Sequence, residues 1–417
     1  MSAEMFENHY SSSMADMIDG MMPQQMKEVV SSQPIIPVIA ARAKEIIKKE
    51  SNFVRSDQGQ ILEISKELEI PYGPSNGLPE LREAVASFWN AFYELYLPLD
   101  SDNVCIVTGA TEGLSLVLKL VSYREKIGIL PLHWSNYRGI IKACHGEPVV
   151  IDIFDNRGNL DLDMAEDQVR QHGIRTLLVN FPTNPTGESL DRSEYERFAA
   201  FIRDMDLLVI SDEVYGALRL DGQCLSMLQF LPHRTILIGG ASKEFLIPGA
   251  RVGYVICYDK KIAGQWLPRL VRASTSNPNV PGQNAFLPLL KQTVKDLQAG
   301  KEPGLLSEIK NNLVKRRDTL IEVLGKCGLS VIRRKGQQPV GGISLLARLP
   351  EDIDESDKDF VELALTHKKF SAVPGSSFGF PGTLRIGYGG MTIGQIRQFG
   401  RNLQELLDVL RSADRSA

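Results

Sequence analysis

Lys243 is the residue with the clearest chemical potential in this sequence. It follows an apolar run at residues 235–241 that ends in small residues, as a buried strand often does, and Arg251 comes eight residues later. Asp212 and Tyr215 lie upstream in the pattern Asp-x-x-Tyr, directly after another apolar run. A lysine amine forms a Schiff base with an aldehyde, a guanidinium binds phosphate, and a carboxylate keeps a pyridine nitrogen protonated. These four residues together predict a site for pyridoxal 5'-phosphate (PLP).

Short apolar runs alternate with helical patterns in the part of the chain that holds these residues. This alternation predicts an α/β fold, with a mostly parallel seven-stranded sheet flanked by helices. Ligands of such sheets lie at the carboxyl ends of the strands, and the candidate residues between Gly109 and Lys243 follow strands directly. The predicted strands are at residues 103–107, 127–130, 148–153, 176–180, 207–210, 235–238 and 252–257, and the clearest helices at 111–121, 193–205 and from about 137.

The pattern changes after about residue 300, where a long charged helix at 305–324 precedes short strands and a last amphipathic helix. This predicts a smaller α+β domain. We therefore expect an N-terminal arm and start of the small domain at 1–55, a large PLP-binding domain at 56–295 and a small C-terminal domain at 296–417. Seven methionines fall in the first 26 residues. We interpret this stretch as a mobile arm, with packing against a partner subunit as the alternative.

Composition excludes several classes of protein. Apolar residues make up 43% of the chain and charged residues 24%, which is typical of a folded globular protein. A formal net charge of -4 offers no basic field for nucleic acid or an anionic membrane. The five cysteines are spaced widely and mostly lie in apolar runs, as in reduced cytoplasmic proteins. An acidic N-terminus and the lack of any 18-residue apolar run argue against export and membrane insertion, and we expect no metal ion.

Six motifs in this order resemble the class I/II aminotransferases of the fold-type I PLP-dependent enzymes. They include residues 108–113, 133–137, 180–187, 211–215, 242–253 and 384–388, and the resemblance extends from about residue 35 to the final helix. It implies a transaminase of amino acid metabolism, in which an amino acid displaces Lys243 from the cofactor. The freed amine then moves a proton between the α-carbon and C4' of the cofactor. It also implies a homodimer with shared active sites.

The resemblance assigns a set of cofactor contacts. It implies that Gly109, Ala110 and Thr111 hold the phosphate with Ser242 and Arg251, although a plain strand-to-helix turn capped by Thr111 is an equally good interpretation of that motif alone. Trp134 is expected to stack on the pyridine ring, unless it is simply a core tryptophan. Asn184 and Tyr215 are expected at the 3'-oxygen, and Asp212 at the ring nitrogen. Gly240 stands where the family commonly has a phosphate-binding serine.

The same resemblance assigns the substrate contacts. Arg385 is expected to bind the α-carboxylate through two parallel hydrogen bonds, with Asn184 and the backbone of Gly59 beside it. The family's proline after Gly59 is replaced by Ile61, which leaves the amino donor and acceptor open. Tyr72 matches a tyrosine that reaches the neighbouring subunit's phosphate site. Arg272 precedes a Ser-Asn-Pro sequence, as does the arginine that some relatives use to bind a distal carboxylate. This suggests an acidic donor such as glutamate. The alternative is that Arg272 forms an ion pair on the surface.

Other functions remain open on the sequence alone. A PLP enzyme of the same fold could perform elimination, cyclisation or decarboxylation, because the ring stabilises any α-carbanion. A non-catalytic PLP-binding regulator would need a DNA-binding module, which the short acidic N-terminus does not supply. A nucleotide-binding enzyme is disfavoured because neither Gly-x-x-x-x-Gly-Lys-Ser/Thr nor Gly-x-Gly-x-x-Gly follows a strand.

Overall fold

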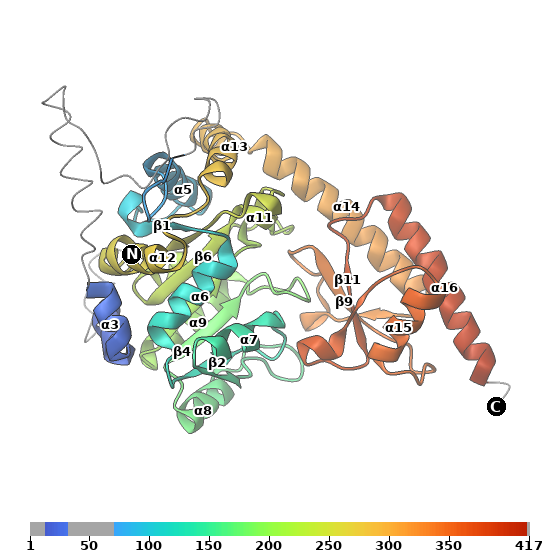
Figure 1. The fold of residues 1–417 in the computed structure, drawn as a ribbon. Helices are drawn as coiled ribbons and strands as arrows, with labels where there is room; N and C mark the ends of the chain where they lie inside the picture. Colours follow the sequence, from blue (N-terminus) through green and yellow to red (C-terminus); the bar gives the residue numbers. More distant parts are fainter. Residues whose placement is uncertain (1–12, 32–70, 415–417) are drawn as a thin grey trace, which may run out of the picture.

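The computed structural model describes residues 13–31 and 71–414, which form a large α/β part and a smaller α+β part. Figure 1 shows the long helix α14 (Gly304–Lys326) running from one to the other. The structure therefore confirms the predicted fold class. None of the helices in the described ranges is both long and apolar enough to cross a membrane.

A seven-stranded sheet forms the centre of the large part, in the order β1-β7-β6-β5-β4-β2-β3. Strand β7 is antiparallel to both of its neighbours, whereas the other four pairings are parallel. Six strands, β1 to β6, therefore run in the same direction, and the polar residues that follow them lie at one edge of the sheet. The strands are β1 (Val104–Val107), β2 (Lys126–Ile129), β3 (Glu147–Val150), β4 (Thr176–Asn180), β5 (Leu208–Asp212), β6 (Thr235–Gly240) and β7 (Gly253–Ile256).

Apolar side chains point to both faces of this sheet, because both are covered by helices. In β6, for example, Ile236 and Ile238 pack on one face and Leu237 on the other. Helices α6 (Ala110–Val121), α7 (Asn136–Ala143) and α12 (Leu267–Thr275) cover the first face. The opposite face is covered by α5 (Pro79–Phe92), α8 (Leu162–His172), α9 (Arg192–Asp204), α10 (Met227–Phe230) and α13 (Val280–Gln298).

The methionine-rich segment differs from our expectation of a mobile arm. Residues 14–31 form helices α2 (Met14–Met21) and α3 (Gln24–Ser31), which pack on the core of the large part. Met14 and Met21 are buried there, and Met14 Sδ lies 3.6 Å from Cys257 Sγ. Flexible methionine side chains fill an irregular surface well, which accounts for the docking of this short segment on its own chain.

The small part contains a four-stranded sheet in the order β10-β11-β9-β8, and each of its pairings is antiparallel. Tyr215 and Leu218 of the large part pack into its apolar core, so this core also joins the two parts. The elements are α14, β8 (Ser330–Val331), β9 (Ser344–Arg348), α15 (Asp357–His367), β10 (Val373–Pro374), β11 (Thr383–Gly387) and α16 (Ile393–Asp414).

Candidate active site

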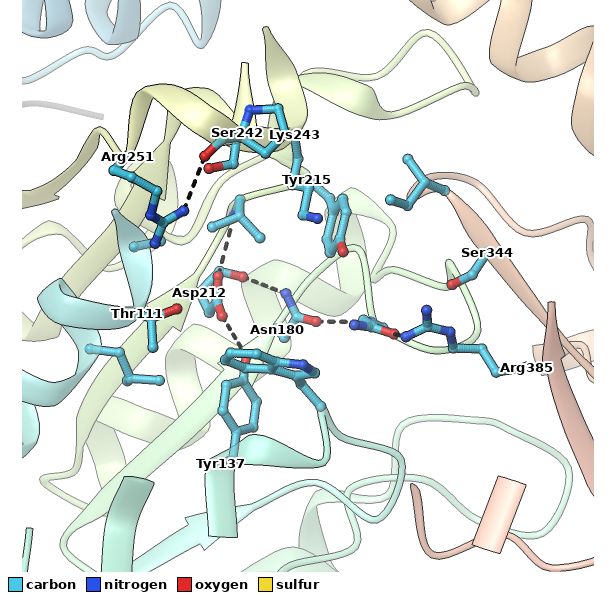
Figure 2. A pocket seen from close by; sticks show the side chains of 17 residues that line it. Thr111, Tyr137, Asn180, Asp212, Tyr215, Ser242, Lys243, Arg251, Ser344 and Arg385 are labelled. Atoms are coloured by element: carbon cyan, nitrogen blue, oxygen red, sulfur yellow. Dashed lines mark hydrogen bonds between the residues drawn. The ribbon is translucent and has the colours of Figure 1, made fainter. Parts of the chain in front are cut away.

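A pocket of about 280 Å³ lies between the carboxyl edge of the large sheet and strands β9 and β11 of the small part. Ten of the predicted site residues line it. Thr111, Ser242 and Arg251 lie at one end, Arg385 at the other, and Asp212, Tyr215 and Lys243 between them (Figure 2). The other three are Ala110, Trp134 and Asn184. Lys243 belongs to the short helix α11 (Ala241–Glu244), which follows β6 directly. Residues from six separate stretches of the sequence thus meet in one cavity.

The end of the pocket at Arg251 is built to accept an anion. Gly109 precedes helix α6 with a φ of 83°, and a Cβ added to it would lie 2.5 Å from Arg251 Nη2. The backbone and the guanidinium are therefore in close approach, which only glycine permits here. Arg251 Nη1 donates to the Pro248 carbonyl at 3.2 Å, and we find no ion pair between Arg251 and the described acids. A helix N-terminus beside a guanidinium free of acids suits a phosphate.

The structure decides one alternative from the sequence and shows the surroundings of Gly240. Thr111 does not cap helix α6, because Gly109 occupies the cap position and Thr111 lies in the first turn, where it lines the pocket. Gly240 is packed tightly, since an added Cβ would lie 3.1 Å from the Val252 carbonyl oxygen. A side chain at this position would need strands β6 and β7 to move apart by a few tenths of an ångström.

Asp212 lies in the floor of the pocket and is held by two donors. Tyr137 donates its hydroxyl to Asp212 Oδ2 at 2.6 Å, and the backbone N–H of Val214 donates to Oδ1 at 3.3 Å. Burial raises the pKa of Asp212 to about 6, while the Tyr137 hydrogen bond opposes this rise by favouring the carboxylate. The result is a buried carboxylate that titrates near neutral pH.

A chain of hydrogen bonds connects Asp212 with Arg385 of the small part (Figure 2). Asn180 Nδ2 donates to the Asp212 carbonyl at 2.7 Å, and its Oδ1 accepts from the backbone N–H of Asn184 at 2.8 Å. Arg385 Nη1 lies 3.5 Å from Asn184 Oδ1, at the limit of a hydrogen bond. Arg385 Nε is buried without a partner, and no described acid pairs with this guanidinium. Its donors are available for a carboxylate that enters the pocket.

Lys243 lies between these two guanidinium groups. Burial, followed by the positive charges of Arg385 and Arg251, lowers the pKa of its amine. The unprotonated amine is the nucleophilic and basic form, and its population increases as the pKa falls. Burial and the charge of Asp212 raise the pKa of Tyr215 to about 12, so its hydroxyl keeps its proton at neutral pH. The pocket therefore combines an activated amine, a phenol and two anion sites.

Three described candidates lie outside the pocket of their own chain. Gly109 shapes the loop without lining the cavity, as stated above. Tyr72 is 72% exposed, and Arg272 Nη2 donates to Ser75 Oγ at 3.0 Å. The predicted Gly59 contact lies outside the described residues.

The sequence interpretation missed several residues of the pocket. Tyr137 and Asn180 both donate hydrogen bonds to Asp212, and Ile343 and Ser344 line the pocket from the small part. Asn180 begins the Asn-Phe-Pro-Thr-Asn-Pro-Thr-Gly motif and Tyr137 comes three residues after Trp134, so each stands inside a motif whose other members were assigned. Ile343 and Ser344 carry no local signal of this kind.

The fold and the pocket, with a lysine amine between two anion sites, agree with the comparisons with known proteins. Residues 40–403 match the sequence profile of the family "Aminotransferase class I and II". This match covers most of the chain, and the protein belongs to that family. It is a transaminase.

Two relatives illustrate how similar this chain is to named proteins. It is 28% identical over 378 residues to a "Probable aspartate/prephenate aminotransferase" of Aquifex aeolicus, covering 84% of this chain and 90% of the relative. It is 29% identical over 391 residues to an "Aspartate aminotransferase" of Pyrococcus abyssi, covering 90% and 93%. The solved structure of an aspartate aminotransferase from Thermus thermophilus with maleate has the same fold, with a TM-score of 0.72, 22% identity and coverage of 95% and 100%.

Proposed function

We propose that this protein is a PLP-dependent aminotransferase that moves an amino group between an amino acid and a 2-oxo acid. The observation that carries the proposal is the position of Lys243, whose amine lies between the guanidinium groups of Arg251 and Arg385. One guanidinium suits the phosphate of a cofactor and the other the α-carboxylate of an amino acid. The membership of the chain in an aminotransferase family supports this reading.

The residues of the pocket fit the cofactor. Gly109, Ala110, Thr111, Ser242 and Arg251 would hold its phosphate. Trp134 would cover the ring, Asp212 would partner the ring nitrogen, and Asn184 with Tyr215 would contact the 3'-oxygen. When bound, PLP supplies an electron sink that acidifies the α-carbon of an amino acid.

The side chains of the pocket have separate roles in the proposed reaction. Arg385 binds and orients the amino acid by its carboxylate. Lys243 Nζ removes the proton from the α-carbon and, with the cofactor bound, would deliver it to C4'. Asp212 remains ionised with the help of Tyr137. The wall of Trp134 and Ile343 limits the access of water to the reacting atoms.

We also propose a homodimer, supported by the surface at residues 71–78. The Tyr72 side chain projects from it, and Ser75 in the same segment accepts a hydrogen bond from Arg272. We propose that Tyr72 and Arg272 reach the partner's pocket from this one interface. Tyr72 would contact the phosphate there, and Arg272 would contact the distal carboxylate of an acidic substrate. Sedimentation of the purified protein over a range of concentrations tests the dimer.

Two further expectations stay proposals. The expected domains are 1–55, 56–295 and 296–417. The second limit has support nearby, because α13 ends at Gln298, three residues past residue 295, and α14 begins at Gly304. A cytoplasmic location is supported by the five free cysteines, of which four are buried.

The experiment is a half-reaction. The purified protein loaded with PLP is mixed with single amino acids without any acceptor, and the products are separated. An aminotransferase should yield a 2-oxo acid and an equal amount of pyridoxamine phosphate. A release of ammonia, carbon dioxide or a cyclised product with PLP unchanged would favour the alternative reactions of this fold. Lys243→Ala should yield no product while its circular dichroism spectrum stays native, and more than trace turnover in this variant would contradict the role of Lys243.

A further inference from the structure

Two buried carboxyl groups lie behind the pocket, each next in sequence to a residue of the site. Glu213 follows Asp212 and is 1% exposed, and Glu244 follows Lys243 and is 0% exposed. Neither forms an ion pair with a described residue. The chain therefore places two acids in its interior beside its most reactive groups, and the cation that acts on Glu244, Lys310, forms no ion pair with it.

Glu244 connects two segments that each carry a residue of the pocket. Its Oε1 accepts a hydrogen bond from the backbone N–H of Ala217 at 2.8 Å. Ala217 belongs to the short turn Gly216–Leu218 that follows Tyr215, whereas Glu244 ends the helix of Lys243. This contact joins the helix that carries Lys243 to the turn that follows Tyr215.

Aromatic side chains enclose the pair of acids. Tyr254 donates to Glu244 Oε2 over a long 3.4 Å and accepts from Trp89 Nε1 at 3.2 Å. A Cβ on Gly216 would lie 2.5 Å from the Tyr93 hydroxyl and 3.6 Å from Glu244 Oε1, so this glycine lets the groups meet. The Tyr93 hydroxyl and Glu213 Oε2 are both buried without a hydrogen-bond partner.

The other contacts of Glu213 are to neutral donors. Its Oε1 accepts from Ser211 Oγ at 2.8 Å and from the backbone N–H of Met227 at 3.0 Å. Burial, opposed by such hydrogen bonds, raises the pKa of Glu213 to about 7 and that of Glu244 to about 8. The titratable and charged groups that act on the two acids and the adjoining Tyr93 are Asp212, Tyr254, Cys224, Lys310 and Arg219.

We propose that Glu244 is a positioning residue that acts in its neutral, protonated form, fixing the helix of Lys243 against the turn behind Tyr215. An ionised Glu244 would face Glu213 in an apolar interior, where an uncompensated charge is costly. A neutral Glu244 needs only one donor at Oε1, which Ala217 supplies. Its own proton lies on Oε2 beside the Tyr254 hydroxyl, where either group can donate to the other. This inference rests on the proposed function, because it concerns the placing of the Lys243 amine.

Replacement of Glu244 by glutamine or by alanine distinguishes the role of its proton from the role of its hydrogen bond with Ala217. Glu244→Gln reproduces a neutral acid, since its oxygen accepts from Ala217 and its amide donates toward Tyr254. Glu244→Ala leaves the Ala217 N–H buried without an acceptor. Glu308→Gln, on the exposed surface of α14, is the matched control for removal of one acid.

Infrared spectroscopy of the PLP-loaded protein at pH 7 measures the proton directly. A protonated carboxylic acid has a carbonyl band distinct from that of a carboxylate, and this band should weaken in Glu244→Gln and remain in Glu308→Gln. An unchanged band in Glu244→Gln would show that Glu244 is ionised and would overturn the proposal even if Glu244→Ala fails to fold.

The absorbance of the lysine-bound cofactor, followed against pH, measures the positioning. Glu244→Gln should keep the native midpoint, whereas Glu244→Ala should shift it by about one pH unit, because the environment of the Lys243 amine changes. A native midpoint in a folded Glu244→Ala protein would remove the positioning role. If the native protein binds no PLP at all, the proposed function fails and the positioning role with it, and the infrared band still reports whether Glu244 carries a proton.

Discussion

Tyr137 donates a 2.6 Å hydrogen bond to the carboxylate of Asp212 in the floor of the pocket. Tyr137 lies near the start of helix α7, and Asp212 ends strand β5. The hydrogen bond therefore joins a helix that covers one face of the sheet to a strand of the sheet. It favours the ionised form of a carboxyl group that burial otherwise pushes toward protonation. The charge at the proposed ring-nitrogen site thus depends on a second residue.

Replacement of Tyr137 by phenylalanine should therefore shift the pH dependence of turnover. The hydrogen bond lowers the pKa of Asp212, so its loss should raise that pKa. The acidic limb of the kcat–pH profile should therefore move to higher pH. We expect about a tenfold lower kcat near pH 6 and a smaller loss near pH 8. Profiles between about pH 5 and 9 measure this effect, with Tyr123→Phe, outside the pocket, as control. A uniform loss at every pH would argue against an effect through Asp212.

Replacement of Arg385 by alanine should weaken the binding of every amino acid substrate. The half-buried guanidinium has no described acid partner, and a bidentate contact with a carboxylate is its expected use. We expect kcat/KM to fall by about a hundredfold for all donors, a loss of roughly 2.7 kcal/mol in transition-state binding. Arg401→Ala on the exposed face of α16 should leave kcat/KM unchanged. A selective loss for one class of donor would assign Arg385 to side-chain recognition instead.

Replacement of Arg272 by alanine tests the class of substrate. If Arg272 crosses a dimer interface to a distal carboxylate, the KM for glutamate and aspartate should rise about tenfold or more, while that for neutral donors stays nearly constant. Steady-state kinetics with both classes of donor provide the comparison. Ser75→Ala removes the acceptor of the Arg272 hydrogen bond and serves as a control for local packing. Equal effects on both classes would leave the donor undetermined.

A buried ion pair also holds the small part against the large part. Arg334 donates to both carboxylate oxygens of Glu194 at 2.7 Å, and Lys335 approaches the same carboxylate. These contacts outweigh burial and lower the pKa of Glu194 to about 2. Because the folded pKa lies below the ordinary value, the stabilisation is full above about pH 4.5 and is lost as the pH falls toward 2.

Glu194→Gln should accordingly reduce stability at neutral pH by about 3 kcal/mol, because it leaves Arg334 buried without its counter-charge. The difference from the native protein should shrink as the pH falls below 4.5. Denaturant unfolding at several pH values measures it. Glu166→Gln breaks an exposed pair with Arg170 and should cost no more than about 0.5 kcal/mol. Similar losses in both variants would show that the Glu194 contact contributes no more to stability than an exposed ion pair does.

The elements of this fold could be predicted from the sequence because their signals are local. Apolar runs of strand length ended at small or polar residues, and the seven predicted strands are those of the sheet. The residues that gather at the carboxyl edge, including Asp212 and Lys243, were recognisable because the topology of such sheets places strand ends together. The docking of Met14 and Met21 was not, because a short amphipathic segment does not reveal the surface that covers it.

Contacts between residues far apart in the chain were decided only by the tertiary structure. Tyr137 and Asp212 are separated by 75 positions, Glu194 and Arg334 by 140, and Asn184 and Arg385 by 201. The charge state of a group such as Glu244 likewise depends on the solvent and partners that packing removes or supplies. The sequence thus determined which chemical groups the protein carries and the order of its elements. Packing determined which groups touch, and hence their orientation and affinity for protons.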